Sequence, residues 1–254
     1  MNGRSASHAR VSHATVSASK VVRRFGGRFS ADLGVDVASD DPAELFQWFL
    51  AAVLFGARIS ETLAIRTYRE FSRRRLLSPR SVVRRGWDGL VEALDAGGYV
   101  RYDFKTATKL LDASKALLDR YQGDLNRLHA AATDSADLEA RLKGLAKGIG
   151  DVTVNIFLRE LRGVWRNAEP LPSALVLMAA ADLRLLPPAL KNRRRSLEML
   201  QQIWIAEGNR SEDFPDFEAA LIRHGLELRR RASRSAPPQR TGSHRGLRQT
   251  RLRD

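Results

Sequence analysis

Cysteine is absent from the sequence. Its absence excludes disulfide bonds, thiolate zinc sites, cysteine nucleophiles and cysteine-ligated iron–sulfur clusters. The five histidines are scattered, and three of them lie near the ends of the chain, so no spacing typical of metal ligands occurs. We therefore expect neither a metal ion nor any other cofactor.

Long hydrophobic runs are also scarce. The longest candidate, LFQWFLAAVLFGA from Leu45 to Ala57, is shorter than the roughly 20 residues of a membrane-spanning helix and has the length of a buried core helix. Alternation of apolar and polar residues, which is typical of strands, is almost absent. Apolar residues recur instead at i, i+3 and i+4 spacing, which predicts an all-α protein of about ten helices without a membrane segment.

Signals for helix starts divide the chain further. Asp41 is an N-cap residue followed by Pro42 at the first helical position, a second helix runs from about Ser60, and Ser78-Pro79 starts a third. The resulting prediction is helices over residues 42–55, 60–74, 79–85, 87–94, 104–121, 125–132, 137–145, 151–162, 173–183, 188–207 and 215–231.

The formal net charge of +14 is concentrated at the two ends of the chain. Residues 1–30 carry six basic residues and no acid, and residues 228–254 carry nine arginines against one aspartate. These segments predict disordered tails over residues 1–38 and 231–254, which hold a polyanion without sequence preference. The folded body is expected over residues 39–230.

The N-terminal segment lacks the apolar stretch of a secretory signal. We therefore expect a cytoplasmic protein, associated with the nucleoid if it is bacterial. Nothing in the sequence specifies the oligomeric state.

The segment LAKGIGDVTVNIFLREL, Leu145 to Leu161, holds two glycines one residue apart, directly before an apolar helical pattern. Glycines permit positive φ and close approach of a ligand to the backbone. The unpaired amides of the following helix favour an anion, above all a phosphate, and Lys147 adds a positive charge. A third glycine and a preceding strand are missing, so this is not a dinucleotide-binding fingerprint. The alternative interpretation is a tight connection between two helices.

The helix, the bend, Thr153 and the apolar run VTVNIFL together resemble the helix-hairpin-helix motif of the DNA glycosylase superfamily that contains endonuclease III and the alkyladenine glycosylases. The upstream run LFQWFLAAVLFGARISETLAIRTYREF resembles the first core helix, DNA-inserting turn and next helix of that superfamily. The run LDAGGYVRYDFKTATKLLDASKALLDRYQGDLNRL resembles its turn, long amphipathic helix and short loop before the hairpin. The resemblance spans residues 41–172.

The resemblance implies a two-lobed helical fold, double-stranded DNA as the partner, and a base flipped into the cleft between the lobes. It implies that Gly148, Ile149, Gly150 and Thr153 grip a DNA phosphate and that Arg58 enters the base stack. A surface arginine at a helix junction is the alternative for Arg58. On this resemblance the protein is a candidate base-excision-repair enzyme, a monofunctional DNA N-glycosylase.

Two departures from the family pattern bear on the chemistry. Bifunctional members carry a lysine two residues after the second glycine as a Schiff-base nucleophile, whereas this chain has Val152 there. Lyase activity through that lysine is therefore not expected. Members also share an aspartate in the loop after the hairpin, where the only acid here is Glu169. Glu169 is the candidate catalytic residue, and a solvated loop acid is its alternative interpretation.

Two further functions remain open from the sequence. One is a catalytically inactive helix-hairpin-helix protein that binds DNA on the same fold. The other is an α-helical interaction protein whose basic tails alone contact nucleic acid.

Overall fold

The computed structural model describes residues 16–57, 59–187 and 190–235 of the chain. Within these ranges the regular elements are helices and no strand occurs, which confirms the all-α class. The elements are α1 (Ala18–Phe25), α2 (Phe29–Asp32), the 3-10 helix η1 (Val37–Ser39), α3 (Pro42–Phe55), α4 (Glu61–Arg73), α5 (Pro79–Gly97), α6 (Asp103–Tyr121), α7 (Leu125–Ala130), α8 (Ser135–Lys143), α9 (Asp151–Arg159), α10 (Ala174–Asp182), α11 (Arg193–Ala206), the 3-10 helix η2 (Ser211–Asp213) and α12 (Phe214–Ser235).

The predicted helix starts in the first half of the chain are confirmed. The Asp41 carboxylate accepts hydrogen bonds from the first-turn amides of α3, and the Ser60 hydroxyl accepts one from the first turn of α4. Ser78 and Ser81 cap the start of α5 reciprocally. The predicted break between residues 79–85 and 87–94 is also confirmed, because the backbone at Gly86 is non-helical (φ 71°, ψ 173°) and divides α5 into two helical segments that meet at a kink. The second segment runs on to Gly97.

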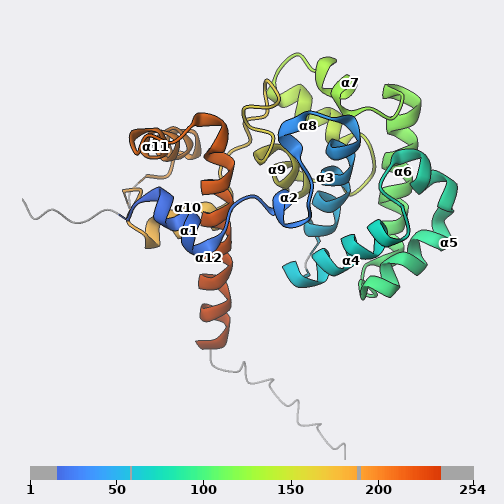
Figure 1. Ribbon diagram of the computed structural model, residues 1–254, viewed down its shortest axis with the longest axis horizontal. Coiled ribbons are helices and arrows are strands. Elements are labelled where there is room, and N and C mark those ends of the chain that lie inside the picture. The colour runs from blue at the N-terminus through green and yellow to red at the C-terminus, as the bar shows by residue number, and fades with distance from the viewer. Residues whose placement is uncertain (1–15, 58, 188–189, 236–254) are drawn as a thin grey trace, which may run out of the picture.

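Helices α2 to α9 form the larger lobe, on the right in Figure 1. Helix α3 is its centre, because most of its residues are buried and it packs against α4, α6, α7 and α9. The indole nitrogen of Trp48 on α3 donates a hydrogen bond to the carbonyl of Phe157 on α9 (3.1 Å). This contact ties α9 to the core of the larger lobe.

Helices α1, α10, α11 and α12 form the smaller lobe, on the left in Figure 1. Helix α12 packs against the other three. It comes very close to α10, because a Cβ atom at Gly225 would lie 2.5 Å from the carbonyl oxygen of Leu175. The chain therefore crosses between the lobes twice, once between α1 and α2 and once between α9 and α10.

The folded body begins nearer the N-terminus than the predicted boundary at residue 39. Helices α1 and α2 lie inside the predicted tail, and Ala18, Val21 and Phe29 are buried in the core. The Glu207 carboxylate at the end of α11 accepts hydrogen bonds from the amides of Ala18 (2.6 Å) and Ser19 (3.0 Å). The prediction of a disordered tail up to residue 38 was wrong, because it rested on the basic composition of this segment. The apolar face of α1 is covered by parts of the chain that are distant in sequence.

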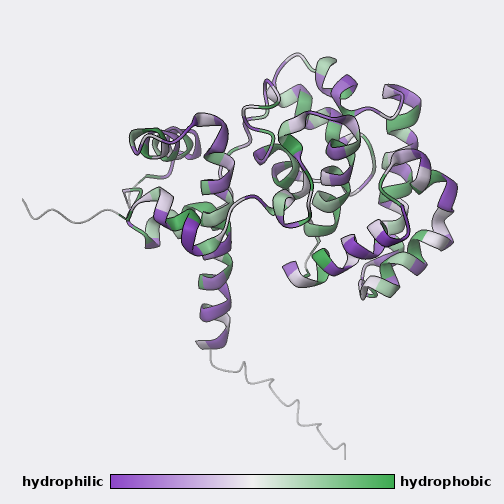
Figure 2. Cartoon of the chain, viewed as in Figure 1, coloured by the Kyte–Doolittle hydropathy of each residue, from purple (hydrophilic) through white to green (hydrophobic). Residues whose placement is uncertain are grey.

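Helix α12 continues to Ser235, past the predicted boundary at residue 230. Its last residues, 229–235, are exposed, and this part projects away from the body with a largely hydrophilic surface (Figure 2). The rest of the predicted tails, residues 1–15 and 236–254, lies outside the described residues. In the described part, the helices are too short or too polar to cross a membrane.

Candidate functional site

The glycine bend, defined as Lys147 to Gly150, leads from α8 into α9. Gly148 has φ +91°, in the left-handed region that favours glycine. Gly150 is the N-cap of α9, with an extended backbone (φ −115°, ψ −175°) that other residues also adopt. Ile149 is buried and its amide donates to the carbonyl of Ala146 (3.2 Å). The bend is therefore anchored by one apolar side chain, while its other residues are exposed.

Backbone amides on the outer side of the bend have no acceptor within the described part of the chain. Those of Gly148, Gly150 and Asp151 form no hydrogen bond to other described residues. No side chain caps α9, and a Cβ atom at Gly150 would meet nothing within 4 Å. Exposed amides at a helix N-terminus, together with the helix dipole, favour an anion in that open space.

A lysine that sequence analysis overlooked lies against the bend. The Cε atom of Lys109 on α6 is 3.2 Å from the place a Cβ atom would take at Gly148, and its ammonium nitrogen is 3.8 Å from it. Partial burial lowers the pKa of Lys109, and no acid of the described chain shifts it in the other direction. The sequence did not indicate that Lys109 is near the bend. Lys109 lies on the polar face of a long helix, and its contact with the bend forms only when the chain folds.

Asp151 is the acid closest in sequence to the bend. Its exposed carboxylate pairs with the ammonium of Lys143 at 2.6 Å. The hydrogen bond from Lys143 lowers the pKa of Asp151 below its usual value. The pair therefore partly neutralises a negative charge that would otherwise oppose an anion at the bend.

Thr153, another residue from the sequence prediction, is not on this surface. Thr153 is 3% exposed, and its hydroxyl fills the space beside Gly56 at the end of α3. Its side chain thus packs α9 against α3 and does not reach the outer side of the bend. Arg58, the candidate for insertion into the base stack, lies outside the described residues.

One face of α9 lines a cavity between the two lobes, which we call the interlobe cleft. Val152, Asn155, Ile156 and Arg159 share this face through i, i+3, i+4 and i+7 spacing, and all four line the cleft, whose volume is about 850 Å³. Other walls come from the end of α3, the start of α4, and helices α10 and α12. Val152, where the family places its lysine, is 62% exposed. Asp151 also lines the cleft, so the cleft begins directly beside the bend.

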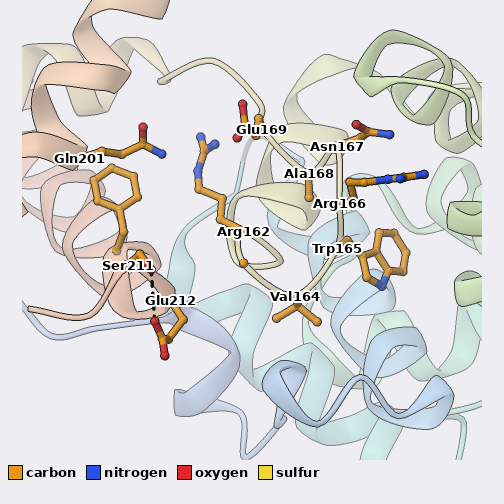
Figure 3. Close-up of a pocket in the computed structure, with 12 residues that line it drawn as sticks. Arg162, Val164, Trp165, Arg166, Asn167, Ala168, Glu169, Gln201, Ser211 and Glu212 are labelled. Carbon is orange, nitrogen blue, oxygen red and sulfur yellow. Dashed lines mark hydrogen bonds between the residues drawn. The ribbon is translucent and has the colours of Figure 1, made fainter. Parts of the chain in front are cut away.

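Glu169 lies in a different cavity, drawn in Figure 3. That cavity measures about 620 Å³ and lies between residues 162–169 and residues of α11, η2 and the start of α12. The Glu169 carboxylate is exposed and pairs with the guanidinium of Arg194 at 3.1 Å. The two cavities share no lining residue. The structure therefore does not bring Glu169 together with the glycine bend.

The segment that carries Glu169 is held in place by Trp165. The indole nitrogen of Trp165 donates to the side chains of Asn126 (2.8 Å) and Asp40 (3.1 Å), and its ring stacks on His129 with centroids 4.6 Å apart. Trp165 is 3% exposed. These contacts hold the backbone just before Glu169 against α7 and the loop before α3.

The carboxylates that line the interlobe cleft are Glu61 and Asp151. Glu61 pairs with Arg223 of α12 at 2.8 Å, across the two lobes. Among the described residues, no group of three or more histidine, aspartate or glutamate side chains is arranged to hold a metal ion. No protein-family model, curated protein or solved structure matches this chain.

Proposed function

We propose that this protein binds duplex DNA by seating a backbone phosphate on the glycine bend, with α8, the bend and α9 acting as a helix-hairpin-helix motif. The observation that carries the proposal is that the amides of Gly148, Gly150 and Asp151, all in exposed residues at a helix N-terminus, have no acceptor among the described residues, while a Cβ atom at Gly150 would meet nothing within 4 Å. Phosphate oxygens are the acceptors that such amides bind in protein–DNA complexes.

Positive charge around the bend supports the same proposal. Lys147 is exposed within the bend, and Lys109 of α6 lies against Gly148. The net charge of +14 adds attraction to DNA that does not depend on base sequence. The order of helices before the bend, which resembles that of the DNA glycosylase superfamily, favours duplex DNA over other phosphate-bearing partners.

A charge-matched pair of variants tests this proposal. The double variant Lys109→Gln with Lys147→Gln removes two positive charges at the bend. The control, Lys20→Gln with Lys191→Gln, removes two exposed lysine charges elsewhere, one on α1 and one in the loop before α11. Affinity for a labelled, undamaged duplex is measured by fluorescence anisotropy over a range of salt concentrations.

We expect the bend variant to bind about tenfold more weakly and to lower the salt slope by about one, because one phosphate contact is lost. The control should stay close to the wild type. Equal losses in the two variants would show that DNA is attracted by overall charge and would contradict a specific role for the bend.

A second candidate function is hydrolysis of an N-glycosidic bond. The observation favouring it is that the cleft of about 850 Å³ opens directly beside the bend, with room for a nucleotide drawn out of the duplex. Val152 replaces the lysine nucleophile, so product would be abasic sites without strand breaks. Glu61 and Asp151 are the carboxylates of the cleft that are available to orient water.

This second function is tested by incubating the protein with duplexes that carry alkylated, deaminated, oxidised or mispaired bases. Abasic sites are then cleaved with alkali. We expect strand breaks only after the alkaline step. If no lesion gives strand breaks after alkali, the hydrolysis proposal is wrong and duplex binding alone remains as the proposed function.

A further inference from the structure

Two exposed aromatic side chains lie against each other where α5 packs on α6, at the right of Figure 1. Trp87 is 37% exposed and Phe104 is 58% exposed, and their ring centroids are 5.3 Å apart. The other three tryptophans, Trp48, Trp165 and Trp204, are buried. Neighbouring apolar groups that remain in water are typical of a binding surface, so this Trp87–Phe104 pair is a candidate for one.

Local structure holds the pair in a fixed position. The non-helical backbone at Gly86 redirects α5 immediately before Trp87. The indole nitrogen of Trp87 donates to the hydroxyl of Thr108 (3.0 Å), and this hydroxyl donates to the carbonyl of Phe104 (2.9 Å). Trp87 is thereby tied to α6 one turn after Phe104. Rings that are already fixed lose little conformational freedom when a ligand binds, which favours binding.

Packing of the turn before α6 does not depend on Phe104. Tyr99 is buried, and its hydroxyl donates to the carbonyl of Leu54 on α3 (3.2 Å). The ring of Tyr102 packs edge-on against Tyr99 and contacts the core. These two tyrosines attach the turn to the larger lobe. Phe104 therefore exposes its ring without being needed as an anchor.

Basic residues accompany the pair. Residues 100–109 include Arg101, Lys105 and Lys109 but only one acid, Asp103. Arg101 and Lys105 are exposed. The Asp103 carboxylate accepts a hydrogen bond from the amide of the next residue (2.7 Å), at the start of its own helix. The excess of positive charge around the exposed rings matches a polyanion.

The same face of α6 leads to the glycine bend. Lys105 and Lys109 are neighbours on the helix surface through i, i+4 spacing, and Lys109 lies against Gly148. Between Phe104 and Lys109 the helix rises about 7.5 Å. This length corresponds to roughly two steps of about 3.4 Å along one DNA strand. A strand whose phosphate is seated on the bend thus comes near the aromatic rings within a few nucleotides.

We propose that the Trp87–Phe104 pair stacks an unpaired base, so that the preferred partner is a DNA duplex with a single-stranded flank. Aromatic rings beside basic groups bind single strands with little sequence preference, because every base has a π face. A base inside a duplex is covered on both faces by its neighbours and does not offer this contact. The inference rests on the duplex binding proposed above and names the kind of DNA that is bound.

Fluorescence anisotropy of the full chain tests the proposal at one salt concentration. The probes are a blunt duplex and the same duplex with a short thymidine overhang at either the 5′ or the 3′ end. Phe104→Ala removes the stacking ring, whereas Phe104→Tyr keeps one. The control, Ile205→Ala, removes an exposed apolar side chain from α11 in the other lobe. Thermal unfolding checks that each variant is folded.

We expect the wild type to bind one of the overhang duplexes about tenfold more tightly than the blunt duplex. Phe104→Ala should weaken binding of that overhang duplex at least about fivefold, and Phe104→Tyr and Ile205→Ala should not. Affinity for the blunt duplex should be the same in all three variants. An overhang preference that Phe104→Ala retains would come from the added phosphates alone and would overturn the proposal, as would equal affinity of the wild type for all probes.

Tryptophan emission gives an independent measurement. Trp87 is the exposed tryptophan, so a stacked base should quench its emission when oligothymidine is added to the wild type. Trp87→Phe keeps an aromatic ring at this position and should remove the quenching. The absence of quenching in the wild type would also contradict the proposal.

Failure of the pair and failure of the glycine bend give different results. If the wild type binds the blunt duplex without preferring an overhang, the pair is not a base-stacking site and the bend proposal stands. If oligothymidine quenches Trp87 but the blunt duplex is not bound, the bend proposal is wrong and the pair remains a single-strand site.

Discussion

Replacing Gly150 by serine separates DNA binding from stability at the glycine bend. Gly150 is the N-cap of α9, its backbone lies in the extended region, and a Cβ atom there meets nothing within 4 Å. Serine is among the preferred N-cap residues, because its hydroxyl accepts a hydrogen bond from an amide of the first helical turn. The hydroxyl would accept from the amide of Val152 or Thr153, and the added side chain would fill the open space beside the neighbouring amides that we assign to phosphate.

The two expected effects have opposite signs. A serine N-cap in place of glycine stabilises a helix by a few tenths of a kcal/mol, so the melting temperature should stay equal or rise slightly. Loss of one hydrogen bond to a charged phosphate costs about 1.5–3 kcal/mol, which corresponds to roughly a tenfold to hundredfold weaker affinity for duplex DNA.

The assay is fluorescence anisotropy with an undamaged duplex at fixed salt, beside thermal unfolding of the same samples. Gly150→Ala serves as the comparison, because it adds the same Cβ atom without a capping hydroxyl. It should weaken binding too, but it should cost up to about 1 kcal/mol of stability, since alanine is a poor N-cap. A folded Gly150→Ser variant that binds duplex DNA as tightly as the wild type would refute the reasoning.

Four further variants follow from the structure. Asp151→Asn should strengthen duplex binding roughly two- to fivefold in the anisotropy assay, because it removes a partly screened negative charge beside the bend. Glu169→Gln should change neither duplex affinity nor the yield of any abasic product, because Glu169 lines the other cavity. Gly225→Ala should lower the melting temperature by several degrees, at about 1–3 kcal/mol, since its methyl group would collide with the backbone of Leu175. Hydrogen bonds from two arginines lower the pKa of Glu70 to about 2. The melting temperature of the wild type should therefore exceed that of Glu70→Gln at neutral pH. This difference should vanish as the pH falls from about 4.5 toward 2, where the carboxylate becomes protonated.

Local signals predicted much of the fold. Capping residues and apolar periodicity placed the starts of α3, α4 and α5 because those features act within a few residues of one another. The helix–bend–helix arrangement around Gly148 followed from the same kind of signal. Helix α1 was missed, because its two buried residues, Ala18 and Val21, are covered by helices that lie far away in sequence.

The candidate site was predicted less completely, for the same physical reason. The sequence identified the bend, but Lys109 comes to it only through the packing of the folded chain. Glu169 was chosen by its place in a loop, whereas the cavity that it lines depends on α11 and α12. Arg159 did leave a trace in the sequence. It shares one helical face with Val152 and Ile156, and a basic residue beside apolar residues there indicates either a buried ion pair or a ligand.

Because α1 and α12 belong to one lobe, the order of synthesis matters for how this protein reaches its native state. The larger lobe is built from consecutive helices and has all of its parts once α9 has been translated. Helix α1 must wait for α11 and α12, since the hydrogen bond between Ala18 and Glu207 joins residues 189 positions apart. At roughly 5–20 residues per second, that delay is on the order of tens of seconds. During this time the apolar side of α1 lacks the helices that bury it in the native protein.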